Sequence, residues 1–196
     1  YDLSAEIYPG ETVGIIGGTG SGKSTVAALI PRFYDPTQGT IYMDGIDIKQ
    51  YSFEQLREQI GVVPQRAVLF TGTIESNLKW GNEHATKEQM EQALRIAQAE
   101  EFVSRLPKGL QTEVSQGGAN FSGGQRQRLT IARALVGQPK ILILDDSASA
   151  LDYATDAKLR MAIARETQNM TVIIVSQRAN SIRNADKIIV LDQGHV

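Results

Sequence analysis

Two glycine-rich segments of this chain have residues suited to holding phosphate groups. The first spans residues 17–25, and the second spans residues 122–125, much further along the chain. Glycine lacks the side chain that would keep an anion away from backbone N–H groups, so each segment can form a cradle for phosphate oxygens. One nucleotide needs only one such loop. The second segment therefore suggests a nucleotide that is held between two copies of such a domain.

The first segment fits the pattern G-x-x-x-x-G-K-[ST], whose backbone N–H groups surround the β- and γ-phosphates of a nucleotide. It follows an apolar stretch at residues 12–16 and precedes another at residues 26–30, as expected for a strand and a helix. A glycine-rich turn without a ligand is the simpler explanation of the glycines. The flanking strand and helix favour the phosphate loop.

The polar residues of this loop would complete a nucleotide site. We expect a helix to begin near Gly22 and to direct the positive end of its dipole at the phosphates. Lys23 adds a positive charge, and the hydroxyl of Ser24 is placed to ligate Mg²⁺. The residues expected to bind nucleotide here are Gly17, Thr19, Gly20, Ser21, Gly22, Lys23, Ser24 and Thr25.

Two carboxylates follow a short apolar run later in the chain. Residues 141–144 are all Ile or Leu, and Asp145 and Asp146 come next. Such a run by itself predicts only a buried parallel strand. Next to a phosphate loop it predicts more, because ligands of open α/β sheets bind at the carboxyl ends of the strands. We therefore expect Asp145 to be the acidic group on the Mg²⁺ side of the site.

Together with further motifs in the same order, these segments resemble the nucleotide-binding domain of ABC transporters over essentially the whole chain. Residues 121–128 resemble the ABC signature motif, with Phe121 in place of the more common Leu. Gln65 matches the Q-loop of the family, and residues 149–152 match its D-loop. The resemblance implies that Gln65 contacts Mg²⁺ and takes part in catalysis. It also implies nucleotide contacts from the signature residues Ser122, Gly123, Gly124 and Gln125.

The resemblance implies an ATPase that uses ATP and Mg²⁺ to power transport. Residues 32–36 and 69–74 are similar to the exporter branch, in which this domain is fused to a membrane domain. The domain would then be part of a longer chain, at the cytoplasmic face of a membrane. Members of the family dimerise head to tail. Each nucleotide then lies between the phosphate loop of one domain and the signature of the other.

Two positions depart from the family pattern. Asp146 stands where active members have the Glu that polarises the attacking water, and its side chain is shorter by about 1 Å, which matters for a general base. Gln177 stands where the family has a His that contacts the γ-phosphate. Its amide can donate a hydrogen bond but cannot become cationic. Both changes indicate a weakly hydrolytic site in a heterodimeric exporter. The signature of this chain would complete the site of a non-identical partner.

Three alternatives fit the same motifs. The chain could belong to a fully active homodimeric transporter ATPase, to a soluble ABC ATPase outside transport, or to an ATP-binding clamp without turnover. A soluble ABC ATPase would lack the exporter-like stretch at residues 69–78. It would often carry a long insertion between the phosphate loop and the signature, which this chain does not have.

Composition sets further limits on the function. The 196 residues are 41% hydrophobic, enough to bury the core of one domain. The net charge of −2 argues against nucleic acid as a partner, since such surfaces are usually basic. Cysteine is absent, which excludes disulfides and thiol chemistry. Apolar runs such as residues 172–175 are far shorter than the roughly 20 residues that span a bilayer.

The alternation of strands and helices predicts an α/β fold of the P-loop NTPase type, with a mostly parallel sheet flanked by helices and a small antiparallel β portion. We expect a single domain, with its core at about residues 1–80 and 138–196 and an ABC-type helical subdomain at about residues 81–137. In the subdomain, a capping box at residues 86–89 begins a helix that continues to Leu106. Further elements are expected at residues 123–136 (helix), 171–175 (strand) and 187–191 (strand).

Overall fold

The structure is a computed structural model of the chain, and it describes residues 3–167 and 169–196, without the side chains of residues 148 and 149. The described chain divides into two compact units. The first unit runs up to Val62 and also contains Lys140–Asp146 and Met170–Val196. The second unit contains Val63–Pro139 and Ser147–Asn169. Neither unit is continuous in sequence, so the chain passes between them several times.

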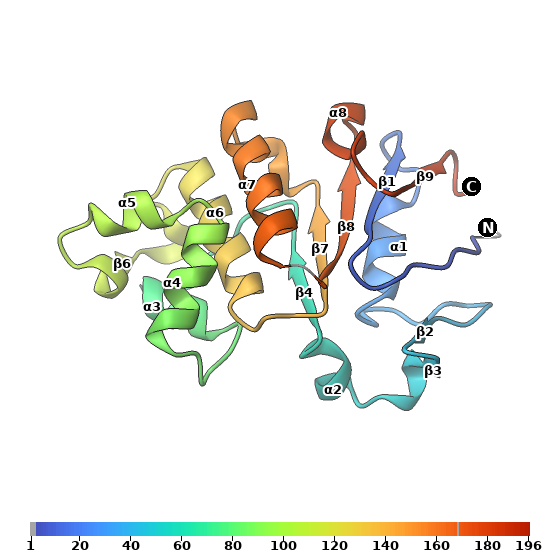
Figure 1. The fold of residues 1–196 in the computed structure, drawn as a ribbon, viewed down its shortest axis with the longest axis horizontal. Coiled ribbons are helices and arrows are strands. Elements are labelled where there is room, and N and C mark those ends of the chain that lie inside the picture. Colours follow the sequence, from blue (N-terminus) through green and yellow to red (C-terminus); the bar gives the residue numbers. More distant parts are fainter. Residues whose placement is uncertain (1–2, 168) are drawn as a thin grey trace. The chain divides into compact units, whose positions relative to one another are not determined.

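A five-stranded sheet forms the centre of the first unit (Figure 1). In spatial order its strands are β4 (Ile60–Val63), β7 (Ile141–Asp145), β8 (Thr171–Ser176), β1 (Thr12–Gly17) and β9 (Lys187–Leu191). β8 is parallel to β7 and to β1, and β1 is also parallel to β9. Every residue of β8 is buried, which explains its unbroken run of Val and Ile.

Helices lie on both faces of this sheet. α1 (Lys23–Leu29) follows β1, and its Ala27 packs in the same apolar cluster as Ile15 of β1. The neighbouring Gly14 faces α8 (Ala179–Ile182), where a Cβ would come within 2.6 Å of the Ile182 side chain. Neighbouring residues of a strand point to opposite faces. α1 and α8 therefore cover opposite faces of the sheet.

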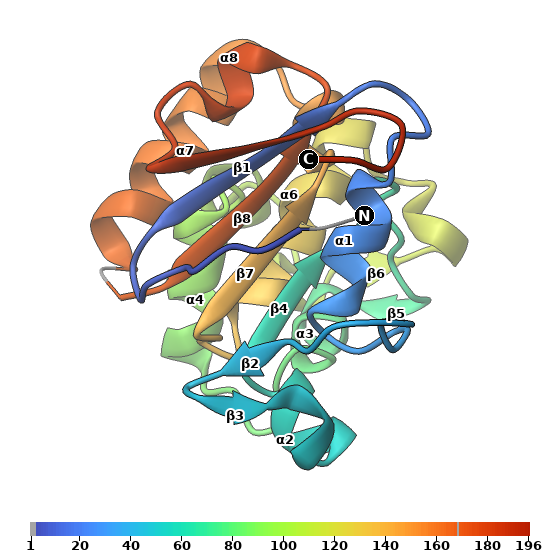
Figure 2. The ribbon, with the colours of Figure 1, turned by 90° about the vertical axis from the view of Figure 1, so that its right-hand side faces the viewer.

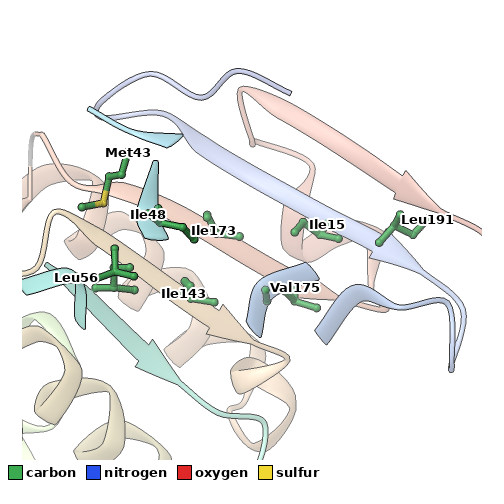
Figure 3. Packing of buried hydrophobic residues seen from close by; sticks show 10 residues of the cluster. Ile15, Met43, Ile48, Leu56, Ile143, Ile173, Val175 and Leu191 are labelled. Atoms are coloured by element: carbon green, nitrogen blue, oxygen red, sulfur yellow. The ribbon is translucent and has the colours of Figure 1, made fainter. Parts of the chain in front are cut away.

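The core of the first unit lies on the face that α1 covers. Residues from all five strands of the sheet, from α1 and from the segment between α1 and β4 meet there. That segment contains the antiparallel pair β2 (Tyr42–Met43) and β3 (Ile46–Asp47), the turn η1 (Ile48–Gln50) and α2 (Phe53–Arg57). Each fully buried side chain of this kind stabilises the fold by about 1.5–3 kcal/mol. Figure 3 shows the cluster, with labels on Ile15, Met43, Ile48, Leu56, Ile143, Ile173, Val175 and Leu191.

The second unit is mainly helical. α6 packs against both α3 and α4, and α4 packs against α7. β5 (Gly72–Thr73) and β6 (Glu113–Val114) form a short antiparallel pair. The helices are α3 (Ile74–Lys79), α4 (Lys87–Ile96), α5 (Glu100–Ser104), α6 (Gly123–Leu135) and α7 (Tyr153–Glu166), with the 3₁₀ turns η2 (Gly109–Gln111), η3 (Gln116–Gly118) and η4 (Ser147–Ala150).

The predicted fold class is confirmed. The chain has an α/β fold with a parallel central sheet flanked by helices, and the small antiparallel portion is present as two short pairs. The predicted strands at residues 171–175 and 187–191 correspond to β8 and β9. Along residues 3–167 and 169–196, no helix has both the length and the apolar character that a membrane crossing requires.

One predicted helix is in fact two. The helix expected over residues 86–106 is interrupted between α4 and α5. Gln98 in the interruption has a left-handed backbone, with a φ of 59°, and its carbonyl oxygen accepts a hydrogen bond from Nη1 of Arg128 at 2.7 Å. The apolar spacing continues across the break, so this tertiary contact was not visible in the periodicity. The capping box between Thr86 and Gln89 is confirmed.

Candidate functional site

The phosphate loop predicted at residues 17–25 connects β1 to α1 in the first unit. Lys23 is buried, and its Nζ donates hydrogen bonds to the carbonyl oxygens of Gly17 at 2.8 Å and Gly18 at 2.5 Å. A third bond reaches Oγ of Ser21 at 3.3 Å. The ammonium group is thus fixed inside the loop. It can meet a phosphate at little further cost in side-chain entropy.

The loop needs glycine at three of its positions. Gly20 and Gly22 have left-handed backbones, with φ of 80° and 96°. A Cβ at Gly17 would overlap the carbonyl oxygen of Leu191 at the end of β9. Residues 18–20 are exposed, as are Ser24 and Thr25 at the start of α1. The backbone of the loop is therefore open to a ligand, as phosphate binding requires.

Ser24 and Asp145 meet at the carboxyl end of β7. Oγ of Ser24 donates a hydrogen bond to Oδ1 of Asp145 at 3.0 Å. Burial raises the pKa of the Asp145 carboxyl above its ordinary value, and the hydrogen bond from Ser24 opposes this shift. The negative charge of Asp146 raises the same pKa further, whereas the positive charge of Lys23 lowers it. A poorly solvated carboxylate next to a hydroxyl is a suitable partner for a hard cation such as Mg²⁺.

The protein supplies few metal ligands of its own. Among the residues that the structure describes, no group of three or more His, Cys, Asp or Glu side chains could hold a metal ion. Mg²⁺ needs no such group, because it commonly binds one or two carboxylates together with substrate phosphates and water. The oxygens of Ser24 and Asp145 fit this mode of binding.

Asp146 has an unusual backbone conformation. Its φ is 42°, in the left-handed region, and its N–H donates a hydrogen bond to the carbonyl oxygen of Val175 in β8 at 2.9 Å. Asp and Asn tolerate this conformation better than other residues with side chains. An Asp therefore suits the backbone at position 146.

Gln177 directly follows β8, which lies between β7 and β1 in the sheet, and its side chain is exposed. The phosphate loop, the two Asp residues and Gln177 thus extend from the carboxyl ends of three neighbouring parallel strands. Figure 2 shows these strands side by side. The structure brings these predicted residues to one edge of the sheet, where open α/β sheets bind their ligands.

The predicted signature residues lie in the second unit, at the start of α6. Oγ of Ser122 accepts a hydrogen bond from the N–H of Gln125 at 3.2 Å, and Oε1 of Gln125 accepts one from the N–H of Ser122 at 2.9 Å. This capping box fixes the first turn of the helix. Within the box the hydroxyl oxygen of Ser122 acts only as an acceptor, so the hydroxyl hydrogen can be donated to a ligand. Gly123 and Gly124 follow without side chains that would cover the helix start.

The remaining predicted residues also belong to the second unit. Gln65 follows β4 and has an exposed side chain. In the D-loop match, the side chain of Ser149 lies outside the described residues, and Oδ1 of Asp152 accepts a hydrogen bond from the N–H of Thr155 at 2.9 Å. The predicted site is therefore divided. The phosphate loop, Asp145, Asp146 and Gln177 are in the first unit, and Gln65 and the signature are in the second.

Sequence reasoning missed two residues that shape the signature. Nη1 of Arg126 donates hydrogen bonds to the carbonyl oxygens of Phe121 at 2.6 Å and Gly118 at 3.4 Å. The side-chain amide of Asn120 binds Ser115 and the backbone of Glu113. In the sequence, Asn120 shows only as a turn-forming residue next to the motif. Arg126 lies within the signature match at residues 121–128, but no periodicity or motif predicts its bonds to the preceding loop.

A family model described as ABC transporter matches residues 1–149 of the chain. The chain belongs to the ABC transporter family. An uncharacterized ABC transporter ATP-binding protein of Mycobacterium tuberculosis is 48% identical over 198 residues, which cover 100% of this chain and 34% of that protein. The ATP-dependent lipid A-core flippase of Chromobacterium violaceum is 43% identical over 194 residues, which cover 99% of this chain and 33% of the flippase.

The solved structure of a bacterial Atm1-family ABC exporter with ATP bound matches this ABC domain with a TM-score of 0.91 and 41% identity, over 96% of this chain and 33% of that chain. The chain thus spans about a third of the length of these ABC relatives. The prediction of an ABC nucleotide-binding domain of the exporter type agrees with the flippase and with the exporter.

Lys23→Ala should lower the affinity of the chain for MgATP by at least about tenfold, because the variant lacks the charge held against the β- and γ-phosphates. Titration calorimetry measures the affinity, and far-ultraviolet circular dichroism checks that the fold survives. Lys158→Ala, which removes an exposed lysine of α7, is the matched control and should bind like the parent. Equal affinities for Lys23→Ala and the parent would contradict this placement of the phosphates.

Asp145→Asn should raise the free energy of unfolding of the nucleotide-free chain at pH 7. The raised pKa of Asp145 means that its charged form weakens the folded state, and Asn removes that charge while keeping an acceptor for Ser24. The increase in the free energy of unfolding should be full at pH values above the folded-state pKa of Asp145. It should vanish at pH values below the ordinary pKa of 3.8. Urea titrations across pH measure it, with the exposed Asp192→Asn as control. A variant less stable than the parent at pH 7 would contradict the argument.

Proposed function

We propose that this chain is the ATP-binding domain of an ABC exporter, which binds MgATP and couples its hydrolysis to transport. The observation that carries the proposal is the meeting of Ser24 and Asp145 beside the fixed Lys23, at the carboxyl edge of the parallel sheet. Oxygen ligands for Mg²⁺ and a cation for the phosphates lie there together. The similarity to an exporter with ATP bound supports the same function.

Different residues of the chain would bind the phosphates of ATP and the metal ion. The open backbone of residues 18–20 and the ammonium group of Lys23 would hold the β- and γ-phosphates. Ser24 and Asp145 would hold Mg²⁺. When bound, Mg²⁺ supplies positive charge that offsets the charge developing on the transferred phosphoryl group. The protein's part in the chemistry is then mainly positioning and electrostatic stabilisation.

A second ABC nucleotide-binding domain, arranged head to tail, would complete each ATP site. The hydroxyl of Ser122 and the N–H groups of Gly123 and Gly124 begin a helix of 13 residues, a suitable partner for the γ-phosphate held by another chain. The capping bond from Gln125 keeps Ser122 in place. This arrangement accounts for two phosphate-binding segments that belong to separate units of one chain.

The site built by this chain's own phosphate loop would hydrolyse ATP weakly. Asp146 has the left-handed backbone that a shorter acidic residue tolerates, and its carboxylate reaches about 1 Å less far than that of Glu. Gln177 is neutral and cannot relay a proton as His can. A partner that differs from this chain, with Glu and His at these positions, would carry most of the turnover. The assembly would then be a heterodimer.

A membrane domain fused to this one would be the second partner, with the ATP-binding domain at the cytoplasmic face of the membrane. The supporting observation is that the chain spans only about a third of relatives that include a flippase and an exporter. The second unit also presents an exposed aromatic pair, in which the rings of Phe70 and Trp80 lie 5.0 Å apart and Trp80 is 70% exposed. Such a pair is suited to packing against another domain.

Asp146→Glu combined with Gln177→His should raise the ATPase rate of the chain by at least about tenfold, and by more than either change alone, because the pair restores a longer base and an imidazole. The left-handed backbone at residue 146 adds a cost, so Asp146→Glu should lower the free energy of unfolding by about 1 kcal/mol. Steady-state phosphate release and urea titration measure the two effects. Brisk hydrolysis by the unaltered chain would contradict the weak-site proposal.

Ser122→Arg should abolish the ATPase of the assembled transporter, since a bulky cation would block the contact with the γ-phosphate held by the partner. ATP binding at this chain's own loop should stay nearly intact. Asp146→Asn should cost the assembled complex much less, because little turnover passes through that site. Ser104→Arg, at an exposed serine that ends α5, is the control for the added charge and should be active. Equal losses from Ser122→Arg and Asp146→Asn would show that the two sites share the work.

A further inference from the structure

Asn120, two residues before the signature serine, is bonded through both ends of its side-chain amide. Its Oδ1 accepts hydrogen bonds from the N–H of Ser115 at 3.0 Å and from Oγ of Ser115 at 2.9 Å. Its Nδ2 donates a hydrogen bond to the carbonyl oxygen of Glu113 at 2.8 Å. Its own N–H donates a fourth bond, to Oγ of Ser115 at 3.1 Å. One side chain therefore closes the loop from residue 113 to residue 120.

Backbone bonds and a signature arginine tighten the same loop. The N–H of Gly118 donates a hydrogen bond to the carbonyl oxygen of Ser115 at 2.7 Å, and the N–H of Phe121 donates one to that of Gly118 at 2.9 Å. Gly117 and Gly118 both have left-handed backbones, with φ of 65° and 71°. Arg126 of α6 binds the carbonyl oxygens of Phe121 and Gly118. The loop and the first turns of α6 thus form one hydrogen-bonded body.

The far end of this loop is attached to the rest of the second unit. Glu113 lies in β6, which pairs with β5 through Thr73, and the N–H of Ile74 at the start of α3 donates a hydrogen bond to the carbonyl oxygen of Thr112 at 3.1 Å. The position of Ser122 is therefore set from two sides. Its own helix holds it through the capping box, and the β5–β6 pair holds it through Asn120.

We propose that Asn120 is a positioning residue for the signature, which fixes the hydroxyl and N–H groups at Ser122 where the partner's γ-phosphate is met. The inference rests on the proposed function, in which the signature completes the site of the partner. Neither Asn120 nor Ser115 touches nucleotide in this role; both are exposed, and their bonds act within the loop. Rate depends steeply on such placement, because a misplacement of about 1 Å can cost about a hundredfold.

The test uses the assembled transporter and a double-mutant cycle. Asn120→Ala and Ser115→Ala should each lower kcat for ATP hydrolysis by about tenfold. The double variant should be no worse than the more harmful single variant, because both changes break the same set of bonds. Asn120→Asp keeps the acceptor for Ser115 but loses the donor to Glu113, so it should recover part of the rate. The melting temperature, and the ATP affinity of this chain's own loop by calorimetry, should stay at the parental values.

Two controls separate this inference from the function on which it rests. Asn184→Ala, at an exposed asparagine of the first unit, should have the parental rate. Full activity of Asn120→Ala alongside an inactive Ser122→Arg would overturn the positioning role and leave the proposed function standing. An active Ser122→Arg would overturn the proposed function itself. Loss of rate in proportion to a fall in melting temperature, or additive losses in the double variant, would mean that Asn120 serves only stability.

Discussion

The burial of β8 on both of its faces is the constraint on which the rest of the first unit depends. Its neighbours β7 and β1 must lie beside it in parallel register, which pairs Asp145 with Val175 and Ile16 with Ser176. The three strands therefore end at nearly the same level of the sheet. This brings the phosphate loop close enough for Ser24 to reach Asp145. A slip of one residue would exchange the side chains of β8 between the two buried faces of the sheet and would separate these groups.

At the proposed nucleotide site, Asp145 and Lys23 have different hydrogen-bonding partners. Burial and Asp146 both raise the pKa of Asp145, while the nearby Lys23 is bonded to uncharged carbonyl and hydroxyl oxygens. Under the proposed function, Lys23 would meet the phosphates of MgATP and Asp145 would meet its metal ion. Binding of MgATP would then stabilise the folded domain.

Sequence patterns predicted the elements that local chemistry determines. The buried strand β8 and the edge strand β9 follow from their apolar runs, and the start of α4 follows from the capping box at Thr86. The break at Gln98 shows in no local pattern, and the side chain that bonds to the Gln98 carbonyl oxygen is Arg128, thirty residues further along the chain. The left-handed backbone of Asp146 depends on its bond to β8 and shows in no pattern. The same holds for the Asn120 loop. Local sequence patterns predict that a helix or strand forms, whereas its interruptions and the conformations of its neighbouring loops involve contacts between residues distant in sequence.

The order of the strands in the sheet affects how the chain can fold while it is being synthesised. β1, which leads into the phosphate loop, is the first strand in sequence, yet it lies between β8 and β9, the last two. Thr12 pairs with Val172, and Val13 pairs with Lys187. During synthesis β1 therefore has no neighbour in this sheet until β8 has left the ribosome, and Leu191, whose carbonyl oxygen lies against Gly17, follows later still. Contacts so distant in sequence form slowly, so a nascent chain exposes both edges of β1 for most of its growth.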